Sequence, residues 1–483
     1  MQEYIKKIFY NKIIIYLLSR YGTYALQFLT SIIIAAKLGP YEFGVYGFIN
    51  LIIMYFNQLN LGIPHSLNVL LVHNKDNHYE CNRLMLNSFV LYLYIALIII
   101  ISYIYYVSKG LSISNKFNID YYIIFIVLII ITAYFNSLFF VILRIKNKIT
   151  DLTIIQSLNI VVSFIFVIIV RSEKLIYTLL IIQVISNIFS FLYATRNSFF
   201  SINKKNINVE LQLLLLKKGF FLFLYNSCFY FILISIRSII SHNYTIDEFG
   251  IFTFSFTMSN AVMLLLDSIM SLIYPKIINL LSSKNKSELD NALNKVRISF
   301  ISSSHLLIYI AMFCFPILIY FMPKYSNALQ SMNLCALAVL MNTNSYGYST
   351  LLIAQNKEKL NAIISFSALI LNVTLAYVWV YFLKVGFSYV ILATLFTYLY
   401  YSFIIVKEGK RLLNIVDKTS ILKEFFPVKL LLPYSIALIL SICKLENLMI
   451  IVLIIFIILN IKDIRMFIQY GKKILNNSNI INL

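Results

Sequence analysis

The ionisable side chains inside long apolar segments of this sequence include Arg20, Arg237, Asp267 and His305. An arginine can hold a phosphate or a carboxylate through two parallel hydrogen bonds, a carboxylate can take up a proton or a cation, and a histidine can titrate near neutral pH. If the apolar segments cross a membrane, each charge costs about 2.5–3.5 kcal/mol, which makes these residues candidate functional groups.

Each of these residues also has a structural alternative. Arg20 and Arg237 could extend to the lipid headgroups, and His305 could hydrogen-bond a neighbouring carbonyl. Arg20 lies seven residues beyond Ile13, about 10 Å along a helix, and Asp267 lies at a similar distance from the same predicted side. Asp267 could therefore couple transport to an ion, pair with Arg20, or form an ion pair that only holds helices together.

Amide side chains add a neutral polar set. Asn57 and Asn60 share a helical face with Pro64, and the nearby Gly62 predicts a polar, bendable helix that faces protein. Asn260 shares a face with Asp267, and Asn344 lies in another polar stretch. Polar packing alone is the alternative. The candidate substrate-binding residues are Arg20, Asn57, Asn60, Arg237, Asn260, His305 and Asn344, with Asp267 as the candidate coupling residue.

The sequence contains no nucleophile–base signature, phosphate-binding glycine loop or paired-carboxylate motif. The five cysteines are odd in number and widely spaced, which predicts neither a disulfide framework nor a metal site. We therefore expect no enzyme activity, no catalytic residue, no metal and no cofactor. A membrane glycan polymerase or ligase is disfavoured because the predicted outer loops are short.

Composition decides the class of protein. Of the 483 residues, 60% are hydrophobic and 12% are charged, with a mean hydropathy of +0.84. Soluble domains carry about 25% charged residues, so this chain cannot cover a water-facing surface. The fold class is an all-α polytopic membrane protein, because apolar windows of about 20 residues recur along the chain.

Polar breaks predict about fourteen membrane-spanning helices. They are expected at 13–36, 44–70, 84–107, 121–143, 152–170, 175–195, 218–240, 249–274, 298–321, 332–354, 360–382, 386–406, 427–443 and 447–461.

The charge balance orients these helices. The chain carries 40 Lys and Arg against 19 Asp and Glu, a net charge of +21. Alternating loops place thirty basic residues on the side of the N-terminus and eight on the other side. The positive-inside rule then puts both termini in the cytoplasm. It also accounts for the positive charge, so nucleic acid is not an expected partner.

An internal repeat predicts the architecture. Glu42–Tyr46 recurs as Glu248–Phe252, Asn136-Ser137 as Asn344-Ser345, and Asn147-Lys148 as Asn356-Lys357, at offsets of 206 to 209 residues. Each repeat contains six spans, so two parallel six-helix bundles should face a central cleft. The expected domains are an N-terminal lobe (1–196), a cytoplasmic linker (197–212), a C-terminal lobe (213–406), and a loop, helix pair and tail (407–483).

The segment Ala35–Tyr46, which contains Lys37-Leu38-Gly39-Pro40, resembles the first outer loop of polysaccharide and O-antigen flippases of the multidrug/oligosaccharidyl-lipid/polysaccharide (MOP) superfamily. Arg237 matches the arginine of an Asp-Arg pair in that family, although Ile236 replaces the aspartate. The pairs Leu158-Asn159 and Leu371-Asn372 are also similar to the family's Leu-Asn pairs.

The resemblance implies a two-lobed transporter of twelve or fourteen helices in the bacterial cytoplasmic membrane. Such a protein flips an undecaprenyl-diphosphate-linked oligosaccharide, an O-antigen or capsule repeat unit, by alternating access. Its implied partners are this substrate, membrane lipids and other polysaccharide-assembly proteins. A multidrug exporter of the same fold and a peptidoglycan-precursor flippase are the alternatives within the superfamily.

Overall fold

The computed structural model describes residues 12–74, 77–146, 148–198, 206–281, 286–414, 425 and 427–476. All of the regular secondary structure in these ranges is helical. Side chains are described for most of them, but not for residues 265–280. The chain divides into two compact units. The boundary between them falls between Tyr230 and Phe231, inside one continuous helix.

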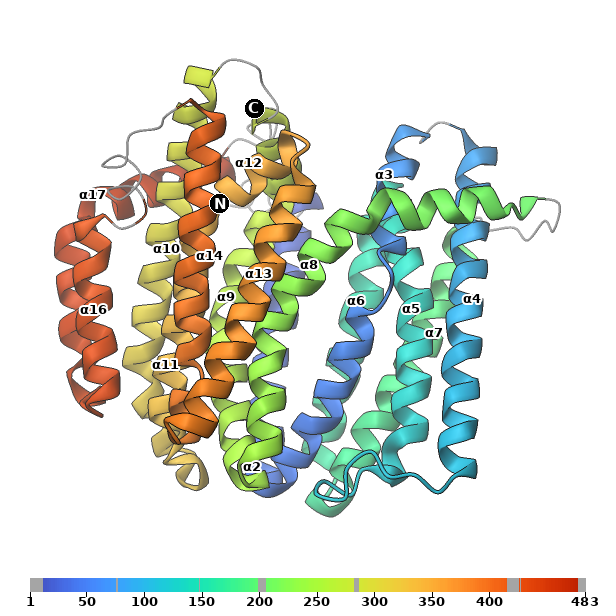
Figure 1. Ribbon diagram of the computed structural model, residues 1–483, viewed down its shortest axis with the longest axis horizontal. Coiled ribbons are helices and arrows are strands. Elements are labelled where there is room, and N and C mark those ends of the chain that lie inside the picture. The colour runs from blue at the N-terminus through green and yellow to red at the C-terminus, as the bar shows by residue number, and fades with distance from the viewer. Residues whose placement is uncertain are drawn as a thin grey trace, which may run out of the picture. The chain divides into compact units, whose positions relative to one another are not determined.

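The first unit, Lys12–Tyr230, is a bundle of long helices (Figure 1). Helix α5 packs against α7, and α2 packs against α6. The helices are α2 (Lys12–Gln58), α3 (Ile63–His73), α4 (His78–Ser108), α5 (Ile123–Ile145), α6 (Ile149–Ile169), α7 (Leu175–Ser198) and the first part of α8 (Val209–Asn243).

The second unit is built around α11 (Ala328–Asn342), which is buried along almost its whole length. Helices α9, α10, α14 and α16 pack around it. Close approach to α9 uses small residues, because Ser255 and Ser331 share a hydrogen bond of 2.6 Å. The other helices are α9 (Ile246–Leu281), α10 (Lys286–Tyr320), α12 (Tyr348–Ala354), α13 (Glu358–Tyr377), α14 (Leu392–Leu412), α16 (Val428–Ile442) and α17 (Met449–Asn476).

The helices follow the predicted apolar segments. Ten helices in the described ranges are long and apolar enough to cross a membrane, and Ile63–Val72 and Val428–Ile442 are shorter apolar helices. The prediction of an all-α polytopic membrane protein is confirmed at this level. Each predicted segment lies in one helix or in two helices separated by a short break, while the number of fourteen crossings stays a prediction.

The first two predicted segments are joined by a kink instead of a loop. Gly39 adopts φ 71° and ψ 174° inside α2 and is followed by Pro40. This backbone conformation is available essentially only to glycine. Next to the kink, Lys37 donates hydrogen bonds to the carbonyls of Ile168 and Val170 at the end of α6. The Lys-Leu-Gly-Pro motif therefore turns the chain and caps a neighbouring helix.

Two predicted segments are broken within their length. The first break separates α2 from α3 at Leu59–Gly62, where both Leu61 and Gly62 have positive φ. The second separates α11 from α12 through a 3₁₀ turn at Thr343–Ser345 and Gly347, with φ 85°. Helix breaks leave backbone carbonyls and amides without their usual partners, so both sites need groups from other helices.

Candidate functional site

Arg20 is held between two helices of the first unit. Its guanidinium donates hydrogen bonds of 2.8 Å to Oε1 of Gln156 on α6 and to the hydroxyl of Tyr24. The same group lies 5.0 Å from the centre of the Tyr24 ring. Its Nε atom is buried and donates to none of the described groups. Arg20 is therefore a half-buried cation with neutral described partners and one buried N–H without a described acceptor.

Asn57 and Asn60 both lie at the first break, as the predicted polar, bendable helix requires. Asn60 donates to the carbonyl of Asn57 at 3.1 Å and accepts from the amide of Gly62 at 3.0 Å. Asn60 thus closes the turn between α2 and α3, in the manner of an Asx turn. Asn57 is half-buried beside it.

Other helices complete the first break. The Tyr134 hydroxyl donates to the carbonyl of Phe56, and Ser227 donates to the carbonyl of Gln58 at 3.4 Å. The start of α3 also contributes His65, whose ring lies 3.5 Å from the amide of Asn226. Sequence reasoning missed these partners, which lie far along the chain from the break.

Arg237 and Asn260 meet at one residue of the second unit. Arg237 is only 4% exposed and lies 5.3 Å from the ring centre of Phe256 and 6.0 Å from that of Phe249. Asn260 donates to the Phe256 carbonyl at 2.8 Å. Arg237 is therefore buried against two aromatic rings, and its role in substrate binding stays a prediction. The side chain of Asp267 lies outside the described residues, so its predicted pairing with Arg20 stays a prediction.

His305 belongs to an aromatic cluster. Its ring is 1% exposed, lies 3.0 Å from the hydroxyl of Tyr309, and stacks on Phe456 of α17 with an interplanar angle of 9°. Tyr434 of α16 approaches the same ring. The arrangement attaches the C-terminal helix pair to α10, so packing accounts for His305 without a ligand.

Asn344 lies at the second break. There the structure places Arg297, which the sequence predicts to lie in a loop just before the segment 298–321. Arg297, only 3% exposed, donates to the carbonyls of Asn344 at 2.9 Å and Tyr346 at 2.7 Å. Its guanidinium lies 4.4 Å from the centre of the Tyr348 ring. A cation at the carbonyl end of a helix is favourable. In the sequence, the polar stretch at Asn344 and the glycine that follows it at position 347 are local features of this break.

A cavity of about 210 Å³ opens beside this second break. Its polar lining includes Arg297, Ser302, Asn344, Lys429 and Asp463. Lys429 and Asp463 form an ion pair. Most of the remaining lining is apolar, from residues such as Ile298, Ile301 and Leu430.

Together these features define a membrane protein whose described secondary structure is helical and which holds arginines inside its apolar helices. No group of three or more potential metal ligands occurs in the searched part of the chain. The cationic character of Arg20, Arg237 and Arg297 suits an anionic ligand better than a cationic one.

Comparison with known proteins identifies the family. The model of the polysaccharide biosynthesis protein family matches residues 9–281, more than half of the chain. The chain belongs to this family, which confirms the resemblance seen in its sequence. No curated protein sequence matches the chain.

This chain shares its fold with solved structures of MOP superfamily transporters. An inward-facing multidrug resistance MATE family transporter has a TM-score of 0.69 at 13% identity, over 84% of this chain and 99% of that chain. An outward-facing MATE family transporter gives 0.61 at 14% identity, over 84% and 95%. A MOP superfamily transporter from Pyrococcus furiosus, described as having a binding pocket of reverse polarity, gives 0.59 at 14%, over 84% and 95%.

Proposed function

We propose that this protein flips an oligosaccharide linked to undecaprenyl diphosphate from the inner to the outer leaflet of the bacterial cytoplasmic membrane. Membership of the polysaccharide biosynthesis family carries this proposal. The fold shared with MOP superfamily transporters supports transport rather than catalysis.

The chemistry of Arg20 supports an anionic substrate. A diphosphate needs donors that remain positively charged, and arginine can hold its oxygens bidentately. Arg20 is oriented by Gln156 and Tyr24, and its Nε–H has no described acceptor. A phosphate group bound at the guanidinium would offset part of the cost of keeping the charge in the membrane.

The remaining candidates suit the glycan part of the substrate. Asn57, Asn260 and Asn344 present amides that can exchange hydrogen bonds with sugar hydroxyls. The half-buried Asn57 lies beside a helix break, a feature that often forms substrate sites in transporters. Alternating access would then expose the substrate to one side of the membrane at a time.

The decisive experiment is transport in reconstituted vesicles. The purified protein is incorporated with a fluorescent polyprenyl-diphosphate oligosaccharide, and a membrane-impermeant glycosidase reports the fraction of substrate in the outer leaflet. We expect protein-dependent transfer, and slower transfer with the Arg20→Ala variant. Equal transfer in protein-free vesicles would refute the proposal.

The shared fold also favours one alternative, a multidrug exporter, because two of the similar structures are MATE family transporters. An exporter of cationic drugs would lower the accumulation of a cationic dye in cells, and lipid-linked oligosaccharides would be unaffected. A peptidoglycan-precursor flippase would accept the disaccharide-pentapeptide substrate in the same vesicle assay. These two readouts separate the three functions.

A further inference from the structure

We propose that the first turns of α8, residues Val209–Lys218, form a membrane-interface anchor that binds the headgroup region of the leaflet on the lysine-rich side. We name this segment the linker helix. The inference concerns the membrane partner of the first unit and does not depend on which substrate is transported.

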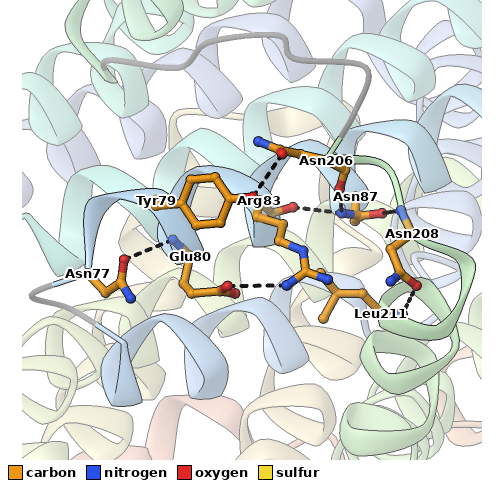
Figure 2. Close-up of polar contacts among 8 residues, drawn as sticks. All are labelled: Asn77, Tyr79, Glu80, Arg83, Asn87, Asn206, Asn208 and Leu211. Atoms are coloured by element: carbon orange, nitrogen blue, oxygen red, sulfur yellow. Dashed lines mark hydrogen bonds and ion pairs between the residues drawn. The ribbon is translucent and has the colours of Figure 1, made fainter.

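The start of the linker helix is fixed to α4 through Asn87 (Figure 2). Asn87 is 0% exposed and uses both ends of its amide. Its Nδ2 donates to the carbonyl of Asn206 at 2.9 Å, and its Oδ1 accepts from the backbone amide of Asn208 at 2.9 Å. Tyr79 donates to the Asn206 side chain at 3.0 Å. This clamp holds the chain just before the linker helix.

The helix start itself is well capped. Asn208 Oδ1 accepts from the amides of Glu210 at 2.7 Å and Leu211 at 3.2 Å. An asparagine in this position satisfies donors that would otherwise be orphaned. The linker helix therefore begins at a defined residue with a defined direction.

The other end is fixed by a close backbone contact at Gly219. A Cβ atom at this position would lie 2.2 Å from Oγ of Ser66 and 2.8 Å from the carbonyl oxygen of Gly62. Only glycine permits this approach of α8 to the start of α3. With both ends held, the rotation of the linker helix about its own axis is determined.

This rotation buries one face and exposes the other. Gln212 and Leu215, on the same side as Gly219, are buried against the first unit. Away from this face, Val209 is 67% and Leu213 60% exposed. Leu214 is also exposed, and the exposed Phe220 and Phe221 follow directly after the segment on α8.

Charged residues on the exposed face point to a lipid surface. Lys217 and Lys218 are exposed, and Glu210 is the exposed acid on this segment. Apolar side chains with lysines beside them suit the boundary between acyl chains and phosphates. In Figure 1 the segment runs across α4 instead of along it, as an interfacial helix does. Further along α4, to which Asn87 fixes the segment, Leu97, Ile101 and Ile104 are exposed apolar side chains, as expected of a helix that crosses a membrane.

Spin labels test this placement in nanodiscs. In a background without the five native cysteines, a label at Leu213→Cys should lie about 5–10 Å below the phosphates, the depth of interfacial helices. Labels at Ile101→Cys and Lys109→Cys serve as lipid and water references, since one lies on the exposed face of α4 and the other in an exposed loop. A label at 213 that is as accessible to aqueous relaxants as the label at 109 would overturn the proposal, as would one shielded from both lipid and water by a protein partner.

Two variants test the causes separately. Asn87→Leu removes the clamp, so the 213 label should show a broader range of depths while gel filtration still shows a monodisperse protein. Lys217→Gln with Lys218→Gln should abolish the increase in depth that anionic phosphatidylglycerol produces over phosphatidylcholine. An unchanged depth distribution in the Asn87→Leu variant would contradict the role of the clamp. An unchanged response to phosphatidylglycerol in the double glutamine variant would contradict the role of the lysines.

Discussion

Arg20 and Arg297 both donate hydrogen bonds to neutral groups, but the positions of these groups suggest different roles. Arg20 has a described donor without an acceptor, whereas Arg297 caps a helix break with two carbonyl contacts. The same side chain can therefore serve a ligand in one place and the fold in another. Substitutions should separate these roles.

At Arg20 we predict loss of transport without loss of protein. A hydrogen bond to a charged group contributes about 1.5–3 kcal/mol, so Arg20→Ala should reduce substrate affinity by about 10- to 100-fold. Arg20→Lys should be milder because the charge remains. Surface glycan and membrane abundance are measured in the same cells. Normal glycan export in an adequately expressed Arg20→Ala strain would assign Arg20 a structural role only.

At Arg297 we predict the opposite pattern, a loss of stability. Arg297→Met leaves the carbonyls of Asn344 and Tyr346 without their cationic donor, which should cost about 1.5–3 kcal/mol for each charged hydrogen bond lost. Thermal unfolding followed by fluorescence-detected gel filtration measures the effect. Arg465→Met is the matched control, because Arg465 is exposed. Equal melting temperatures for the two variants would contradict this capping role.

At the scale of elements, the two helix breaks have different causes. The first is closed by Asn60 and by carbonyl contacts from other helices. The second depends on Gly347, where a Cβ atom would lie 2.7 Å from Cγ of Arg297. Glycine at this position allows both the positive φ and the close approach.

We therefore predict that Gly347→Ala destabilises the second unit. A side chain at φ 85° is strained, and such strain costs about 1–3 kcal/mol. Gly386→Ala is the control, since Gly386 has φ −65° and a Cβ atom there would lie 4.0 Å from its nearest neighbour, an atom of the Tyr389 ring. In differential scanning calorimetry of both purified variants, only Gly347→Ala should have a lower melting temperature than the unsubstituted protein. A similar decrease in both would indicate a general sensitivity to helix-end substitutions.

At the scale of the whole molecule, the distribution of lysines predicts the orientation in the membrane. Single cysteines near Lys204, Lys286 and Lys418 should react with an impermeant maleimide only after cells are opened, because the positive-inside rule predicts that these basic loops lie on the cytoplasmic side. Cysteines at Lys109 and Lys384, on the other predicted side, should react in intact cells. Labelling at position 286 from outside would reverse or invalidate the predicted topology.

Much of the helical architecture follows from the sequence alone. Apolar windows separated by polar breaks determine where helices run, because helix formation and membrane insertion depend on neighbouring residues. The first break could also be predicted, since Asn57, Asn60 and Gly62 are close together in the chain. The lysine asymmetry and the Lys-Leu-Gly-Pro motif likewise identify the class of protein and its family without any coordinates.

Only the tertiary structure shows what each polar side chain contacts. Arg20 meets Gln156 across 136 positions of sequence, and Asn87 meets Asn206 across 119. Arg297 looks like one more basic loop residue until the helices pack, and His305 is enclosed by aromatic rings from α16 and α17. Helical periodicity specifies which face a residue occupies, whereas the partner on that face depends on how distant helices pack.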